Sequence, residues 1–130
     1  MLKVGTSRID ITPPIGIPHA NWGSSVHQVA EGIDMNMYCY IMYLESKDSK
    51  TKVAILDFDL CIIDDDIDSM VRDAVISSLD IPRENIRVST SHTHAGPPYG
   101  RDDSTGGGWI TEGVELINPY YDSYPEKISN

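Results

Sequence analysis

The segment from Val53 to Thr90 constrains the fold most strongly, because its hydrophobic period changes twice along a short stretch of chain. Residues 53–60 form an apolar run that is typical of a central strand. Over residues 65–79 the apolar side chains recur at the spacing of a helix with one buried face, and residues 86–90 again favour a strand. Strand, helix and strand in this order predict a βαβ unit with two parallel strands.

Two further strands are predicted before this unit. Residues 2–11 alternate apolar and polar side chains until Pro13 and Pro14 end the pattern. Residues 34–45 are rich in tyrosine, isoleucine and methionine, and a polar turn leads from them to residues 53–60, so these two segments should form a hairpin. The predicted fold class is therefore α/β, with a mixed β-sheet that contains the βαβ unit.

An irregular segment, residues 15–32, lies between the first two predicted strands and is rich in glycine, proline, serine and asparagine. Loops of this length in compact domains are typically functional or disordered, and the presence of His19 and Trp22 favours a functional loop. Taken singly, His19 and His27 are each expected to be solvated rather than catalytic.

The part of the chain after Gly96 carries turn signals and no full helical period. Asn118 and Pro119 indicate the start of a helix, and the chain ends soon afterwards. Residues 1–130 are therefore predicted to form a single, incomplete domain. A domain of this kind can expose apolar surface, so self-association is expected.

Charge and composition exclude several classes of partner. Twenty acidic residues against ten lysines and arginines give a net charge of −10, which disfavours nucleic acids and anionic membrane surfaces. No apolar run approaches the roughly 20 residues of a transmembrane segment. As written the chain is expected to be cytoplasmic, and secreted if a leader was removed. Cys39 and Cys61 are too few and too far apart for a disulfide framework, and we expect both to be reduced, buried thiols.

Two histidines stand out in the stretch "VSTSHTHAGPPYG". His92 and His94 follow the carboxyl end of the strand at 86–90, and Asp59 closes the neighbouring strand. Ligand sites in open α/β sheets form beyond such strand ends. In an extended chain residues two apart point the same way, so both imidazoles can face one crevice beside the Asp59 carboxylate. Imidazole and carboxylate are zinc ligands, although the same residues can simply cap turns.

Four stretches occur in the order and spacing of the N-terminal part of neutral/alkaline (non-lysosomal) ceramidases, and the sequence resembles that family over residues 3–98. The stretches are "VGTSRIDITPPIGIP", "EGIDMNMYCYIMYLE", "VAILDFDL" and "VSTSHTHAGPP". The family's Asp-Ile-Thr motif is matched by residues 10–12, and its Asp-Leu motif by residues 59–60. Its His-Thr-His-Ser-Gly-Pro signature is matched by residues 92–97, except that Ala95 replaces the serine.

The resemblance implies a zinc amidase that cleaves the N-acyl bond of a sphingolipid-like or other acyl substrate. By this resemblance His92 is the zinc ligand and His94 a catalytic or substrate-contacting residue. Asp59 and Gly96 would either contact the substrate or support the zinc ligand. The family's other ligands, a histidine, a glutamate and a tyrosine, lie far downstream and have no counterpart here. The chain would then be the N-terminal part of a larger α/β catalytic domain and inactive alone.

Two alternatives stay open. A self-sufficient small hydrolase would use His92, His94 and Asp59 without further chain. A non-catalytic α/β binding module, or degenerate homologue, would instead hold a small ligand or partner chain with the loop at 13–32 and the tyrosine-rich tail. The departure at Ala95 favours this second alternative, because a hydroxyl group is lost at the site.

Overall fold

The computed structural model describes residues 1–19, 27–101 and 111–130. These residues form four strands, β1 (Leu2–Asp10), β2 (Tyr38–Ser46), β3 (Lys52–Phe58) and β4 (Ile86–Thr90). The helices are α1 (Asp65–Leu79), α2 (Ile117–Asp122) and α3 (Tyr124–Ser129), with short 3-10 turns at Arg83–Asn85 and Val114–Leu116.

The four strands form one mixed sheet in the order β1-β2-β3-β4. β1, β2 and β3 are antiparallel neighbours, and β2 and β3 form a hairpin with Cys39 opposite Phe58. β3 and β4 are parallel, with Ala54 opposite Ile86, and α1 connects them. The α/β fold, the mixed sheet and the βαβ unit predicted from the sequence are thereby confirmed.

Two strand boundaries differ from the prediction by more than one residue, and in both cases the main chain makes hydrogen bonds outside the strand ladder. β2 begins at Tyr38 rather than at residue 34, because Met37 is tied to the segment after β1: its carbonyl accepts from Ile11 N at 2.9 Å. β3 ends at Phe58 rather than at residue 60, because Leu60 N donates back to the Phe58 carbonyl at 2.8 Å and turns the chain.

Helix α1 begins where its sequence predicts. The Asp64 side chain accepts from Ile67 N at 2.9 Å, which satisfies a main-chain donor that the first turn leaves without a helical partner. Three further aspartates lie in the first turn, at the positive end of the helix dipole. The buried face of the helix consists of Ile67, Val71, Ala74 and Val75.

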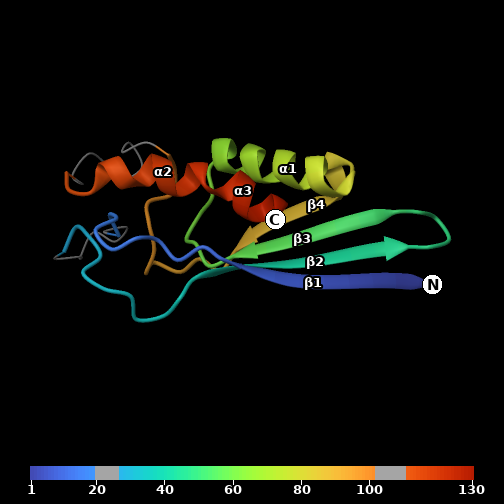
Figure 1. Ribbon diagram of the computed structural model, residues 1–130, viewed down its shortest axis with the longest axis horizontal. Coiled ribbons are helices and arrows are strands. Elements are labelled where there is room, and N and C mark those ends of the chain that lie inside the picture. Colours follow the sequence, from blue (N-terminus) through green and yellow to red (C-terminus); the bar gives the residue numbers. More distant parts are fainter. Residues whose placement is uncertain (20–26, 102–110) are drawn as a thin grey trace.

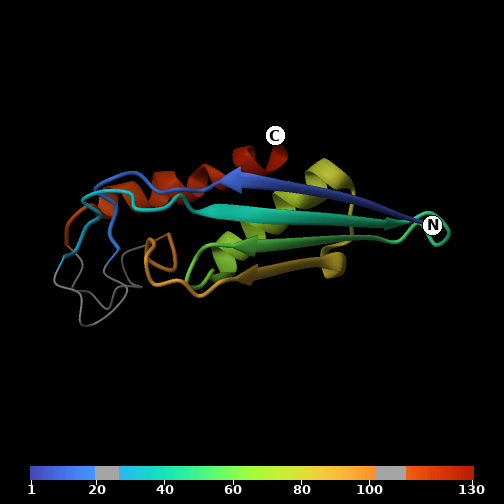
Figure 2. The same ribbon diagram turned by 90° about the horizontal axis from the view of Figure 1, so that it is seen from below.

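The helices all lie on the same side of the sheet, with α1 above the strands and α2 above the loops beyond their ends, so the molecule has two layers (Figure 1). The core between the layers includes Leu56 and Phe58 of β3 and Val71 of α1. The opposite face, seen in Figure 2, has no described helix over it and exposes several large apolar side chains. These are Leu2 and Val4 at 59% exposure, Tyr40 at 46% and Met42 at 41%.

The C-terminal helices begin at Ile117, next to the predicted start at Asn118, and they close the core. Tyr120, Tyr121 and Tyr124 are all buried, with 5%, 0% and 1% exposure. The Tyr120 hydroxyl donates to the Ile11 carbonyl at 2.6 Å, and Tyr124 donates to Tyr120 at 2.7 Å. The idea that these tyrosines hold a ligand or partner is therefore wrong, because their rings fill the protein's own interior.

The carboxyl ends of β1, β3 and β4 lie at the same end of the sheet, on the left in Figure 1, where the long loops gather. The N-terminus lies at the far end. None of the helices in the described part of the chain is long and apolar enough to cross a membrane.

Candidate metal centre

The loops that follow β3 and β4 bring Cys61, His92 and His94 together. Because the two strands are parallel, both loops leave the sheet at the same edge. The loops are also tied to each other, since Ser91 N donates to the Phe58 carbonyl at 2.9 Å and Thr90 Oγ1 donates to the Cys61 carbonyl at 3.0 Å. The sequence therefore placed the two histidines at the correct edge of the sheet.

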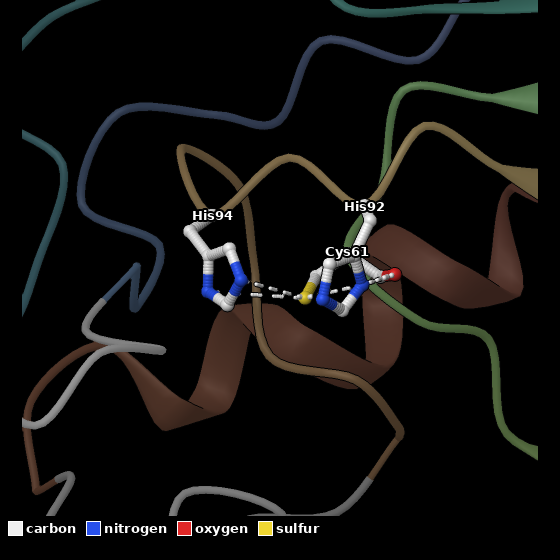
Figure 3. A group of neighbouring side chains, drawn as sticks. All are labelled: Cys61, His92 and His94. Carbon is white, nitrogen blue, oxygen red and sulfur yellow. Dashed lines mark hydrogen bonds between the residues drawn. The ribbon is translucent and has the colours of Figure 1, made fainter.

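The sulfur of Cys61 lies between the two imidazole rings (Figure 3). Its Sγ is 3.5 Å from His92 Nδ1, and it is 3.9 Å and 3.8 Å from Nδ1 and Nε2 of His94. The rings meet edge to face with centroids 4.9 Å apart. One ligand atom from each of the three residues lies within 4.8 Å of the others, so this group can hold a metal ion.

The backbone at His92 sets the direction of its ring. The residue has φ of 61°, a left-handed conformation that is uncommon for a residue with a side chain. Its Nδ1 lies 3.0 Å from the Cys61 carbonyl, and because a carbonyl only accepts, Nδ1 carries the proton. The lone pair of a neutral His92 is then on Nε2, as in many histidine ligands of metals.

The expectation that both histidines lie on one extended strand is corrected by this geometry. β4 ends at Thr90, and the left-handed turn at His92, rather than the two-residue period of a strand, brings the rings together. Both imidazoles lie at one site as predicted, but a left-handed turn and not an extended strand brings them together.

Cys61 is the residue of this group that the sequence interpretation missed. It is a free, buried thiol as expected, with 2% exposure, yet its sulfur contacts both imidazoles instead of serving only as an apolar side chain. Burial raises the pKa of the Cys61 thiol, and a hydrogen bond with the Tyr99 side chain partly opposes that shift. Its position in the sequence could have indicated this role, since Cys61 follows β3 just as His92 follows β4.

Asp59 lies at the same edge but outside the Cys61, His92 and His94 group. Its carboxylate accepts from Tyr38 N at 2.9 Å, and its own N–H donates to the Tyr38 carbonyl at 2.9 Å. These two bonds fasten the start of β2 to the end of β3.

An open cleft of about 500 Å³ borders the histidine loop. Thr93, which lies between the two histidines, lines it together with Ala95, Gly96 and Asp59. Its wall is mainly apolar and includes Ile17, Val29, Ile33, Met35 and Met37.

Four loop residues named in the sequence analysis remain to be located. His19 and His27 line the cleft rather than standing apart from it. The loop residue Trp22 lies outside the described residues. Gly96 allows a close approach, because a Cβ there would lie 2.7 Å from Met37 Cε.

Comparison with known proteins identifies solved structures with a similar fold. No protein-family model matches the sequence, and no curated protein matches it either. Among solved structures, neutral ceramidase from Pseudomonas aeruginosa matches 98% of the chain with a TM-score of 0.74 at 19% sequence identity. A ceramidase in complex with C2 also matches 98% of the chain, with a TM-score of 0.70 at 15% identity.

The chain thus has the fold of a part of neutral ceramidase, which confirms at the level of the fold the resemblance seen in the sequence motifs. It spans 20% of the length of each of these two solved chains.

Proposed function

We propose that this chain is the N-terminal part of the catalytic domain of a zinc-dependent hydrolase that cleaves N-acyl amides. The observation that carries the proposal is the pair His92 and His94 beside Cys61, at the strand ends of a fold shared with neutral ceramidase. The chemistry of the donors supports zinc, because imidazole nitrogen and thiolate sulfur are among its preferred protein ligands.

His92 is the proposed zinc ligand, through Nε2. Its hydrogen bond to the Cys61 carbonyl holds the ring in one tautomer, an arrangement that raises the basicity of a histidine ligand. When bound, zinc supplies Lewis-acid chemistry, since it polarises an acyl carbonyl and activates water.

His94 is the proposed catalytic residue. It is half-buried, and its neighbours Thr93 and Ala95 line the cleft. An imidazole there can bind the substrate's amide or carry a proton to the leaving amine. Asp59 and Gly96 are assigned to the cleft wall, where Asp59 adds a carboxylate and Gly96 leaves room beside Met37.

The proposed substrate is an acyl amide with a lipid-like chain. The cleft has the volume of a small-molecule site, and its apolar wall suits an alkyl chain better than a charged group. The amide end would then lie toward the histidine loop. The chain's length relative to the solved ceramidases supports the view that further residues complete the catalytic site.

The first test is zinc content, measured by elemental analysis of protein purified without chelators or affinity metals. We expect zinc in the full-length protein that contains this chain, because further residues complete the site, and its loss in His92→Ala. His27→Ala is the matched control, because His27 lies outside the Cys61, His92 and His94 group, and it should keep the zinc. Hydrolysis of a fluorogenic long-chain N-acyl amide is then measured on the full-length protein that contains the chain, and it should also depend on His92.

A folded, metal-free protein whose thermal stability does not respond to chelators would contradict the zinc hydrolase. That result would favour the non-catalytic binding module.

A further inference from the structure

We infer that Met37 determines which acyl groups the cleft accepts, by excluding acyl chains that are branched at the carbon next to the amide carbonyl. The inference rests on the proposed function and deepens it, because it assigns the selection of substrate to one side chain of the cleft wall. The sequence motifs assign no role to Met37.

Met37 lines the cleft beside the histidine loop. Its side chain lies against Gly96, because a Cβ at Gly96 would be 2.7 Å from Met37 Cε and 3.6 Å from Met37 Sδ. Gly96 lines the same cleft, as do Thr93 and Ala95 on either side of His94. Under the proposed function the amide carbonyl lies toward this loop, so Met37 would contact the first carbons of the acyl chain.

Hydrogen bonds hold the main chain of Met37 in place. Met37 N donates to Thr12 Oγ1 at 3.0 Å, and the Met37 carbonyl accepts from Ile11 N at 2.9 Å. The next residue, Tyr38, donates its N–H to the Asp59 carboxylate and accepts from Asp59 N, both at 2.9 Å. This part of the cleft wall therefore has a fixed position relative to the ends of β1 and β3.

The side chain of Met37 is confined as well. It is 8% exposed and belongs to the hydrophobic core, whereas Met35, the other methionine of the cleft wall, is 78% exposed. A methionine side chain adapts to irregular gaps, but the core lies on one side of Met37 and the main chain of Gly96 on another. A methyl branch next to the carbonyl would therefore collide with the thioether, while an unbranched chain passes along it.

Hydrolysis of two fluorogenic N-acyl amides by the full-length protein tests this inference. One amide carries an octanoyl group and the other an α-methyl octanoyl group. Wild type should prefer the unbranched amide by about 10-fold or more in kcat/KM, since one methyl group in an apolar pocket changes this quantity by about 10–200-fold. Met37→Ala should remove most of the preference, because it opens the space that the branch needs.

Met35→Ala is the matched control, because it makes the same change at an exposed position of the same cleft wall. It should change kcat/KM for both amides in the same proportion and leave the preference as in wild type.

Gly96→Ala should act in the opposite direction. Gly96 does not have a positive φ, so its backbone accepts alanine, but the added methyl group must displace the end of Met37. Because the core blocks one side of Met37, the thioether should move into the cleft and strengthen the preference for the unbranched amide. Combined with Met37→Ala, the substitution should have no such effect, since the two groups no longer collide. Gly96→Ala keeps Met37, so it tests the inference even where Met37→Ala fails to fold.

Binding of octanoate and α-methyl octanoate, the acids that hydrolysis would release, reports on the cleft without hydrolysis and is measured by isothermal titration calorimetry. Tighter binding of octanoate that is lost in Met37→Ala, in a protein that hydrolyses neither amide, would support the inference and overturn the hydrolase. Equal hydrolysis of both amides by wild type, or an unchanged preference in Met37→Ala and Gly96→Ala, would overturn the role of Met37 and leave the hydrolase standing. Neither hydrolysis nor selective binding would overturn both.

Discussion

Single residues in the Asp10-Ile11-Thr12 motif explain how β1 ends. Asp10 Oδ1 accepts from Thr12 N at 2.8 Å, and Thr12 Oγ1 accepts from Met37 N at 3.0 Å. The motif thus ties the end of β1 to the residue just before β2. Its observed role is to build the edge of the sheet on which the cleft lies, since Thr12 and Met37 both line that cleft.

Asp10 should contribute stability that depends on pH. The hydrogen bonds from the side chain and the main chain of Thr12 hold the pKa of Asp10 below its ordinary value of 3.8. A lowered folded-state pKa means that this stability is present above 3.8 and is lost as the pH falls through the lower folded-state value. Urea unfolding of wild type and Asp10→Ala, at neutral pH and in acid, should give midpoints that differ at neutral pH and converge in acid. A constant difference would contradict this.

Tyr120→Phe should destabilise the protein by about 1–3 kcal/mol, because it leaves the buried Ile11 carbonyl without its donor. It also removes the acceptor of the Tyr124 hydroxyl. Urea unfolding measures the loss. Tyr40→Phe is the control, since Tyr40 is 46% exposed and its change should stay within about 0.5 kcal/mol. Equal effects of the two substitutions would refute the role assigned to Tyr120.

Among the elements, helix α1 and the β2–β3 hairpin were the parts best predicted from sequence. The signals of α1 are local, because its cap and its apolar period both lie within the segment itself. The start of β2 was less well predicted, since it depends on bonds from Asp59 and the Asp10–Thr12 motif, which are distant in sequence.

The cap of α1 can be tested by itself. Asp64→Ala should destabilise the protein by about 0.5–2 kcal/mol, because Ile67 N loses its acceptor. Asp66→Ala, a change in the same first turn, should cost less, because it removes only an interaction with the helix dipole. Urea unfolding of both variants measures the difference, and a larger effect of Asp66→Ala would contradict the assignment of the cap.

For the whole molecule, self-association stays a prediction. The open face of the sheet exposes Leu2, Val4, Tyr40 and Met42, and contiguous apolar surface promotes association. Sedimentation velocity over a range of concentrations should show an average mass that rises with concentration. Val4→Lys combined with Met42→Lys should reduce the rise. A monomer at every concentration would contradict the prediction.

The sequence by itself determined the βαβ unit, the hairpin and the edge of the sheet at which His92 and His94 lie, because hydrophobic period and chain order are local properties. Only the tertiary structure decided that Cys61 joins them, since its approach depends on the turn at Leu60 and on bonds between two separate loops. The tertiary structure also decided that the tail tyrosines are core residues. Composition alone does not tell a buried aromatic ring from one that meets a ligand, because the difference lies in what packs against it.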